Sequence, residues 1–436
     1  MAVTQVLGTD KALRLNNFNT LGLVQNFSWQ PNFNAQDVFE LGRTTRLDTL
    51  MELETSGSFE LASSGNLAGL IARMKAKYNS GTGAFEGFEY APTASGTGVN
   101  GYTFNQDDLA ALKFDAVLHE KTEQKTFNRS VYLGCCYPTT LTGRVDTTGM
   151  AMDTVNWAGQ FVVGFPSPYH VVRSVPATKA SSSTLTLIDG AAYNTGWTLA
   201  YVTIDGIPYT TEVANPVYAA FSGGTITMSA GYTVPSGVVA TAVFYKTTPV
   251  SGDNQWSAVH TPDTVGSGAT AVFGVRGYQA NVYIAPVNEA SPVSSEQWLR
   301  VQSLDYSVDL RMEALRQVAY NDQGTTIYQR VPTYPLTMSV NATVMETDWA
   351  DWKAMLTKSF TGSNVYDNVY DFAPENMKKE FAVIIDYFTK QGTKVQTVTF
   401  GDLRVDSMGS RVNVGGRGEI TWSFRGSEFQ VQGFNI

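Results

Sequence analysis

The chain has 436 residues and a formal net charge of -9, from 30 Lys and Arg against 39 Asp and Glu. Only 16% of the residues are charged, whereas 43% are hydrophobic and 39 are glycine, which favours a folded, mostly β protein over wholesale disorder. The acidic balance and the absence of any run of Lys or Arg argue against a protein that grips nucleic acid through its phosphates.

The start of the chain carries no targeting signal that we recognise. The first residues, MAVTQVLGTDKALRL, lack the charged and then apolar order of a signal peptide, and no stretch of 18 apolar residues follows anywhere. We therefore expect a protein that is made and kept in a cytoplasm. The length suggests two or three domains, which we place at residues 1–170, 171–262 and 263–436.

The first region contains a predicted hairpin with one wet face. Between residues 51 and 61 polar and apolar side chains alternate with the period of a strand, and the polar set is Glu52, Glu54, Ser56, Ser58 and Glu60. The preceding run, 33–41, is also extended in character. After this hairpin, apolar residues at helical spacing predict one helix that covers the back of a sheet, namely Leu67, Leu70, Ile71 and Met74.

The sequence offers few candidate residues for catalysis or metal binding. The only cysteines, Cys135 and Cys136, are adjacent, and we expect two buried thiols because vicinal cysteines rarely bridge each other. The histidines His119, His170 and His260 have no partner at metal-ligand spacing. No nucleotide-binding or nucleophile motif occurs either, so we expect no enzyme, no cofactor and no metal.

The middle region, 171–262, differs in composition from the rest. It holds 7 charged residues in 92 and is rich in Thr, Ser, Gly, Val and Ala. Short apolar runs separated by Gly, Pro and Asn turns predict a small, Ig-like β-sandwich inserted between the two halves. A flexible linker is the alternative.

The third region, 263–436, repeats the first. The pair Val24-Gln25 returns as Val301-Gln302, and 301 minus 24 gives an offset of 277. Further matches place Leu53 on Leu336 (offset 283), residues 144–149 on 404–409 and residues 155–157 on 420–422. A second helix is expected around Trp349, Trp352 and Leu356. Four matches in the same order predict an internal duplication.

The repeated hairpin and helix resemble those of bacteriophage tail tube proteins, most visibly in VQNFSWQPNFNAQDVFELGRTTRLDTLMELETSGSFEL. The resemblance covers both halves. It implies two tail-tube-like β-sandwich domains, each with a long hairpin and one flanking helix, plus the inserted small β-sandwich. The resemblance is to the fused type, in which three chains close a pseudo-hexameric ring and stacked rings form a conduit for DNA ejection.

The resemblance also suggests which side chains line the conduit. From 30 to 61 there are six acids and two bases, and from 303 to 344 four acids and three bases. An acidic wall offers DNA no phosphate-binding steps, so DNA should slide past it. The candidates for the lumen are Glu52, Glu54, Glu60, Asp309 and Glu313, and the insert is expected on the outer surface.

The partners implied by the resemblance are further copies of this chain, a tape measure protein, a terminator and tip proteins. The location implied is the virion tail, assembled in the host cytoplasm, with DNA passing through unbound and no membrane contact. Three alternatives stay open. A tail terminator or tip protein of the same fold would cap a ring, a surface glycan-binding adhesin would require an export signal, and a tail-spike depolymerase would require solenoid repeats.

Overall fold

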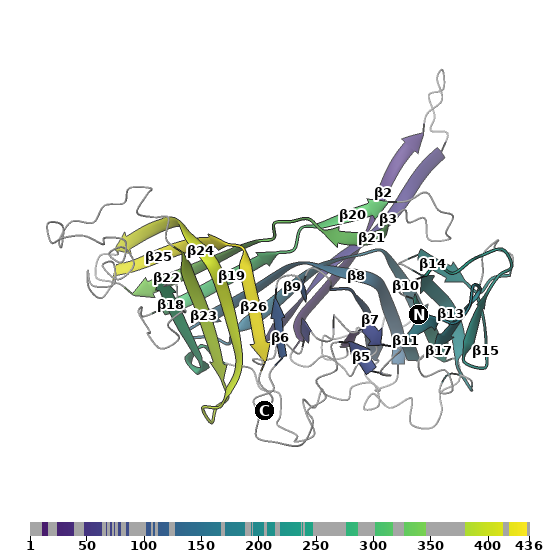
Figure 1. Ribbon diagram of the computed structural model, residues 1–436, viewed down its shortest axis with the longest axis horizontal. Coiled ribbons are helices and arrows are strands. Elements are labelled where there is room, and N and C mark those ends of the chain that lie inside the picture. The colour runs from purple at the N-terminus through teal and green to yellow at the C-terminus, as the bar shows by residue number, and fades with distance from the viewer. Residues whose placement is uncertain are drawn as a thin grey trace, which may run out of the picture.

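The computed structural model is mostly β (Figure 1). It describes residues 11–15, 24–38, 48–62, 77–79, 84–86, 102–105, 112–121, 127–166, 171–187, 195–204, 207–213, 219–236, 240–246, 276–286, 301–316, 327–345, 380–412 and 418–433, with the single positions 67, 70, 71, 74, 108, 109, 193 and 238.

Fifteen of the described strands hydrogen-bond into one sheet that folds back on itself. Its central stretch, which we call the joined sheet, has the order β24-β25-β22-β19-β8-β9-β3-β2. The members from the first half are β2 (Val24–Val38), β3 (Asp48–Ala62), β8 (Phe127–Asp146) and β9 (Met152–Gly159). Those from the second half are β19 (Val301–Asp309), β22 (Thr337–Met345), β24 (Lys394–Val412) and β25 (Gly418–Gly426).

A second layer of strands covers one face of the joined sheet. In the first half it consists of β1 (Lys11–Leu15), β7 (Phe114–Lys121) and β10 (Phe161–Pro166), and in the second half of β18 (Ala280–Pro286), β23 (Phe381–Phe388) and β26 (Glu428–Gly433), with β6 (Tyr102–Asn105) beside β26. The long strands β8 and β24 pass from one layer into the other. Each turns at a residue with positive φ, Cys135 (φ 53°) or Asp402 (φ 47°).

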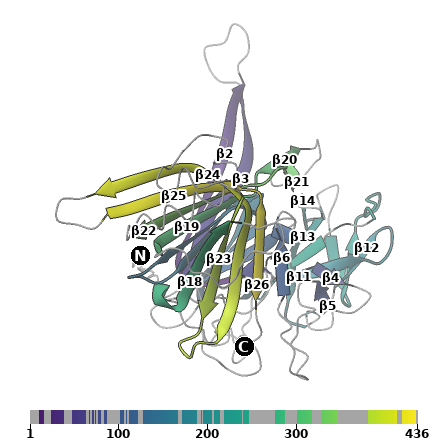
Figure 2. The same ribbon diagram turned by 60° about the vertical axis from the view of Figure 1, so that its left-hand side comes forward.

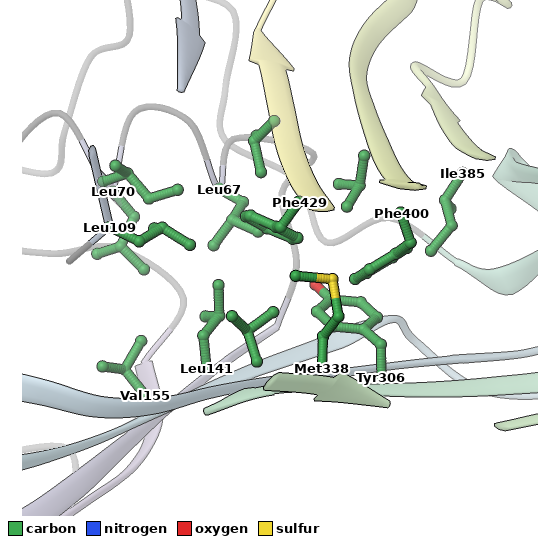
Figure 3. Packing of buried hydrophobic residues seen from close by; sticks show 14 of the residues in the cluster. Leu67, Leu70, Leu109, Leu141, Val155, Tyr306, Met338, Ile385, Phe400 and Phe429 are labelled. Carbon is green, nitrogen blue, oxygen red and sulfur yellow. The ribbon is translucent and has the colours of Figure 1, made fainter. Parts of the chain in front are cut away.

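The hydrophobic core lies between these layers (Figure 3). Leu141, Val155, Tyr306 and Met338 rise from the joined sheet, and Phe400 and other side chains of the covering layer meet them. All five are at most 3% exposed. The alternation predicted for residues 51–61 is confirmed where side chains are described, since Thr55, Phe59 and Leu61 are buried whereas Glu54, Ser56, Ser58 and Glu60 are half-buried.

The two halves repeat the same strand register. Val24 lies opposite Leu61 and Val301 lies opposite Val344, with a β-bulge at the next residue, Gln25 or Gln302, in both. The offsets are therefore 277 on β2 and β19 and 283 on β3 and β22, as the sequence predicts. β8 and β9 repeat in β24 and β25 with a constant offset of 267 residues. The same offset relates the β-bulge between residues 138 and 140 to the one between 405 and 407, and it relates Cys135 to Asp402, the residues at which the long strands turn.

Two of the sequence matches are wrong in detail. Arg144 lies opposite Met152 near the β8–β9 turn, whereas Arg404 lies opposite Arg425 at the far end of the β24–β25 pair. The structural counterpart of Arg144 is Arg411, 267 residues on. The match of 155–157 with 420–422 is likewise two residues out of register, and a two-residue slip keeps every side chain on its face, so alternation cannot detect it.

The second hairpin is interrupted where the first is continuous. β2 and β3 pair without a break from Asn26 to Val38, while β19 ends at Asp309 and the chain resumes in a separate two-stranded sheet, β20 (Met312–Arg316) with β21 (Ile327–Pro332). Arg311, with φ 42°, breaks the extended run. The second hairpin therefore consists of two segments, β19 with β22 and β20 with β21, where the first is one continuous ladder.

The predicted helices stay predictions. Of the first, the structure describes Leu67, Leu70, Ile71 and Met74, which are helical and buried in the core. The second, around Trp349 to Leu356, lies outside the described residues. A short pair of strands, β4 (Lys77–Asn79) and β5 (Ala84–Glu86), follows the first helical segment.

The strands of the middle region form their own seven-stranded sheet with the order β14-β13-β17-β11-β12-β16-β15. They are β11 (Val171–Lys179), β12 (Thr184–Leu187), β13 (Thr198–Ile204), β14 (Ile207–Thr210), β15 (Ala219–Ser222), β16 (Thr225–Met228) and β17 (Ala240–Lys246). This sheet has its own core and packs on the covering layer, where the rings of Tyr132 and Tyr201 lie 5.7 Å apart. The predicted boundary at residue 262 lies outside the described residues.

Candidate functional site

One face of the joined sheet is polar over both halves, and we call it the polar face. It comprises every second residue from 26 to 32, 54 to 60, 154 to 156 and 140 to 146 in the first half, and from 303 to 309, 337 to 343, 419 to 425 and 407 to 411 in the second. Most of these residues are Ser, Thr or Asn. The opposite face carries the core.

The polar face is tied together by hydrogen bonds between neighbouring strands. Ser28 Oγ and Ser58 Oγ are 2.8 Å apart, and Asn156 Nδ2 donates to Thr140 Oγ1 at 2.6 Å. Asn32 Nδ2 donates to Ser56 Oγ at 3.1 Å. Cross-strand pairs of this kind stabilise a sheet on its wet side without giving it charge.

The predicted lumen carboxylates do not form one acidic row. Glu54 and Glu60 lie on the polar face, and Glu54 Oε1 lies 3.6 Å from Arg330 Nη2 of β21, with side chains 23% and 10% exposed. The Glu54–Arg330 pair joins the hairpins of the two halves. The side chain of Glu52 lies outside the described residues.

The two candidates in the second half have different surroundings. Asp309 lies at the end of β19, where Oδ1 accepts a hydrogen bond from the Arg311 backbone N–H at 3.0 Å and Oδ2 lies 3.7 Å from Arg311 Nε. Glu313 is exposed on β20, outside the joined sheet. The structure thus places Asp309 with Glu54 and Glu60 on one face and separates Glu313 from them.

The acidic estimate from the sequence overlooked cations on the same face. Arg144 lies 3.1 Å from Asp146 Oδ2 and 3.7 Å from Asp305 Oδ1, and Arg425 lies 3.3 Å from Asp406 Oδ2. The Thr148 backbone N–H and hydroxyl, followed by Arg144, lower the pKa of Asp146. Because these arginines are paired with carboxylates, the polar face is closer to neutral than the hairpin charges alone indicate.

The two halves meet where β8 pairs antiparallel with β19, which we call the internal junction. It brings Gly143 opposite Tyr306 and Leu141 opposite Val308, all buried. Tyr306 Oη donates a hydrogen bond to Asp153 Oδ1 at 2.9 Å, and burial, followed by Asp153, raises the Tyr306 pKa well above its ordinary value. The internal junction is therefore a contact between two copies of one unit that is dry on the core side of the sheet.

Two edges of the joined sheet are open among the described residues. β2 pairs only with β3, and residues 404–412 of β24 pair only with β25. The hairpins that carry these edges leave the body in different directions (Figure 2). In the first half the corresponding part of β8 pairs on both sides, with β9 and with β19.

Groups that could do chemistry are sparse in the described part of the chain. It contains no group of three or more His, Cys, Asp or Glu that could hold a metal. Cys135 and Cys136 form no disulfide and are buried, as predicted, and burial raises the pKa of Cys136 well above its ordinary value. His119 is buried with Nδ1 2.8 Å from Ser130 Oγ, while His170 and His260 lie outside the described residues.

A cavity of about 150 Å³ opens where β19 begins, lined by residues that include Val145, Tyr278 and Val301. Its lining holds no Asp, Glu, His, Cys, Lys or Arg. Among the described residues, no helix has the length and hydropathy to cross a membrane.

Comparison with known proteins adds no relative. No protein-family model matches the chain, and no curated protein matches it significantly.

Proposed function

We propose that this chain is the structural subunit of a bacteriophage tail tube, in which three copies close a ring and stacked rings form a conduit for DNA. The observation that carries the proposal is the internal junction. One chain already joins two copies of the same strand unit edge to edge in one sheet, and the outer edges of that sheet are the two strands that repeat the edges of the junction.

Open strand edges are a liability unless another chain completes them, and closing a sheet into a ring removes them. Eight strands of each chain lie side by side in the joined sheet. Three chains would therefore place twenty-four strands around the ring. In this proposal each half is a tail-tube-like sandwich with its own flanking helix, as the resemblance implies.

The polar face suits the wall of a DNA conduit. Its Ser, Thr and Asn side chains carry no charge, and two of its arginines, Arg144 and Arg425, are paired with carboxylates, while Arg411 lies at the open β24 edge. Duplex DNA is held mainly by cations that neutralise its phosphates, so a wall with so few of them gives the DNA little to bind. The carboxylates Glu54, Glu60 and Asp309 add weak repulsion, screened beyond about 8 to 10 Å at physiological salt.

The place of the insert agrees with this orientation. The joined sheet has the polar face on one side and the core on the other, and the covering layer lies beyond the core. The seven-stranded sheet packs on the far side of that layer through Val172, Tyr201 and Val243. With the polar face toward the lumen, the insert lies on the outside of the tube.

The biological setting belongs to the same proposal. The partners would be other copies of this chain, a tape measure protein, a terminator and tip proteins, and the location would be the virion tail after assembly in the host cytoplasm. DNA would pass through without specific binding.

Negative-stain electron microscopy of the purified full chain tests the proposal. We expect hollow tubes whose end views, after rotational averaging, show rings with threefold modulation and protrusions at the insert. Single closed rings that never stack would favour the tail terminator instead, and monomers at all concentrations would overturn both.

A further inference from the structure

We infer that neighbouring chains pair β2 of one with β24 of the next in a single register, which places Ser28 opposite Arg411, Gln30 opposite Gly409 and Asn32 opposite Ser407. The inference rests on the ring in the proposed function and specifies its lateral contact. The partner it names is a second copy of this chain, and its basis is the internal junction.

The register follows from the repeat. At the internal junction Asp305 lies opposite Arg144, Ser307 opposite Thr142 and Asp309 opposite Thr140. The β19 residues correspond to β2 residues 277 positions earlier, and the β8 residues correspond to β24 residues 267 positions later. Applying both offsets converts each internal pair into one pair between chains.

The exposure of apolar side chains on β2 supports this contact. Leu304, Tyr306, Val308 and Leu310 are at most 3% exposed at the internal junction. Their counterparts on β2 are exposed to a greater degree: Phe27, Trp29 and Pro31 are half-buried, and Phe33 is 62% exposed. The same core-facing positions are therefore covered where a neighbouring strand is present and uncovered where it is absent.

The β24 edge shows the same contrast. Leu141 is 3% exposed, whereas its counterpart Met408 is half-buried. Gly143 is buried, whereas its counterpart Ser410 is exposed. Opposite the large Tyr306 lies Gly143, and the inferred register sets the small Ser410 opposite the large Trp29. Burying the apolar side chains at both edges would stabilise the contact.

The phase of the hydrogen bonds is also specified. The Leu310 N–H donates to the Thr139 carbonyl at 2.9 Å, next to the pair of Asp309 and Thr140. In an antiparallel ladder this makes the polar-face pairs the non-hydrogen-bonded ones, whose side chains lie closest. The Phe33 N–H would then donate to the Asp406 carbonyl of the neighbouring chain.

Pro31 modifies this ladder. Its counterpart Val308 has an N–H directed at β8, and proline has none, so the contact between chains has one hydrogen bond fewer than the internal junction. Proline on an open edge also discourages pairing with unrelated strands. The contact between chains is therefore weaker than the internal junction, because it lacks this hydrogen bond.

Disulfide trapping in the full chain tests the register. Asn32→Cys with Ser407→Cys should give covalent oligomers that end at the trimer on a non-reducing gel, because opposite Cβ atoms are closest in a non-hydrogen-bonded pair and approach the roughly 3.5–4.5 Å that a disulfide spans. Asp309→Cys with Thr140→Cys is the matched control, since it occupies the same geometry within one chain and should crosslink without forming oligomers. Ser28→Cys with Ser407→Cys is out of register by four residues and should stay monomeric.

The outcomes separate this inference from the proposed function. Trimers from the in-register pair alone support the register. Tubes in the microscope without that crosslink, or with the shifted pair crosslinked instead, would overturn the register and leave the tube intact. Crosslinked trimers that never stack would leave the register intact and remove the tube, and no oligomers while the internal control closes would overturn the contact between edges.

Discussion

Replacing Gly143 by alanine should weaken the internal junction. A Cβ at residue 143 would overlap the ring of Tyr306, which is 3% exposed and whose hydroxyl bonds Asp153 Oδ1 at 2.9 Å. The ring must move, which adds about 1–3 kcal/mol of overpacking. Loss of a hydrogen bond to a buried carboxylate adds about 1.5–3 kcal/mol.

The free energy of unfolding of the unassembled chain, from urea denaturation, should therefore fall by about 2.5–6 kcal/mol. Gly409→Ala is the matched control, because a Cβ there meets nothing within 4 Å, and it should change stability by less than about 1 kcal/mol. In a Tyr306→Leu background the cost of Gly143→Ala should shrink. A Gly143→Ala chain as stable as the Gly409→Ala chain would refute the packing described for the internal junction.

Three further outcomes are expected. Burial raises the pKa of the Asp115 carboxyl group, so the folded chain binds a proton there more tightly than the unfolded chain does and loses stability as pH rises through the folded pKa. Asp115→Asn should remove this loss, and melting temperatures that shift equally in both proteins between pH 4 and pH 8 would contradict it. Pro31→Val should supply the backbone N–H that proline lacks in the β2–β24 ladder, and it should lower the concentration at which light scattering detects assembly by about five-fold, the equivalent of about 1 kcal/mol. An unchanged concentration would argue against the inferred pattern of hydrogen bonds between β2 and β24. Glu54→Gln should remove the 3.6 Å pair with Arg330 and lower the free energy of unfolding by about 1 kcal/mol at low salt and by less at 1 M salt, so a salt-independent effect would show that charge is not its cause.

The sequence shows the repeat because side-chain alternation and bulge residues leave a local trace. Gln25 and Gln302 occupy the same bulge, and the offsets of 277 and 283 read from short identities equal those of the strand pairs. The wet and dry faces of residues 54–61 follow from the same alternation, whereas the burial of the adjacent Cys135 and Cys136 is expected from the chemistry of vicinal thiols.

Short identities failed where register mattered. The repeated Arg-Val-Asp at 144 and 404 is a chance identity seven residues out of register, and it lies at opposite ends of its strand pair. The match of 155–157 with 420–422 is two residues out, a slip that only the hydrogen-bond ladder reveals. The charges of the hairpins suggested an acidic wall, but Arg144 and Arg425 come from strands far along the chain and reach the same face only through pairing.

The β class and the alternation of faces could be predicted from the sequence because they depend on residues close together in the chain, and the duplication could be predicted because short segments recur in the same order. Only the tertiary structure decided that β8 pairs with β19, that Tyr306 packs over Gly143, and that β2 and β24 keep open edges. These contacts join residues more than 150 positions apart. Their choice depends on which edges remain after the local hairpins have formed, and no local pattern encodes that.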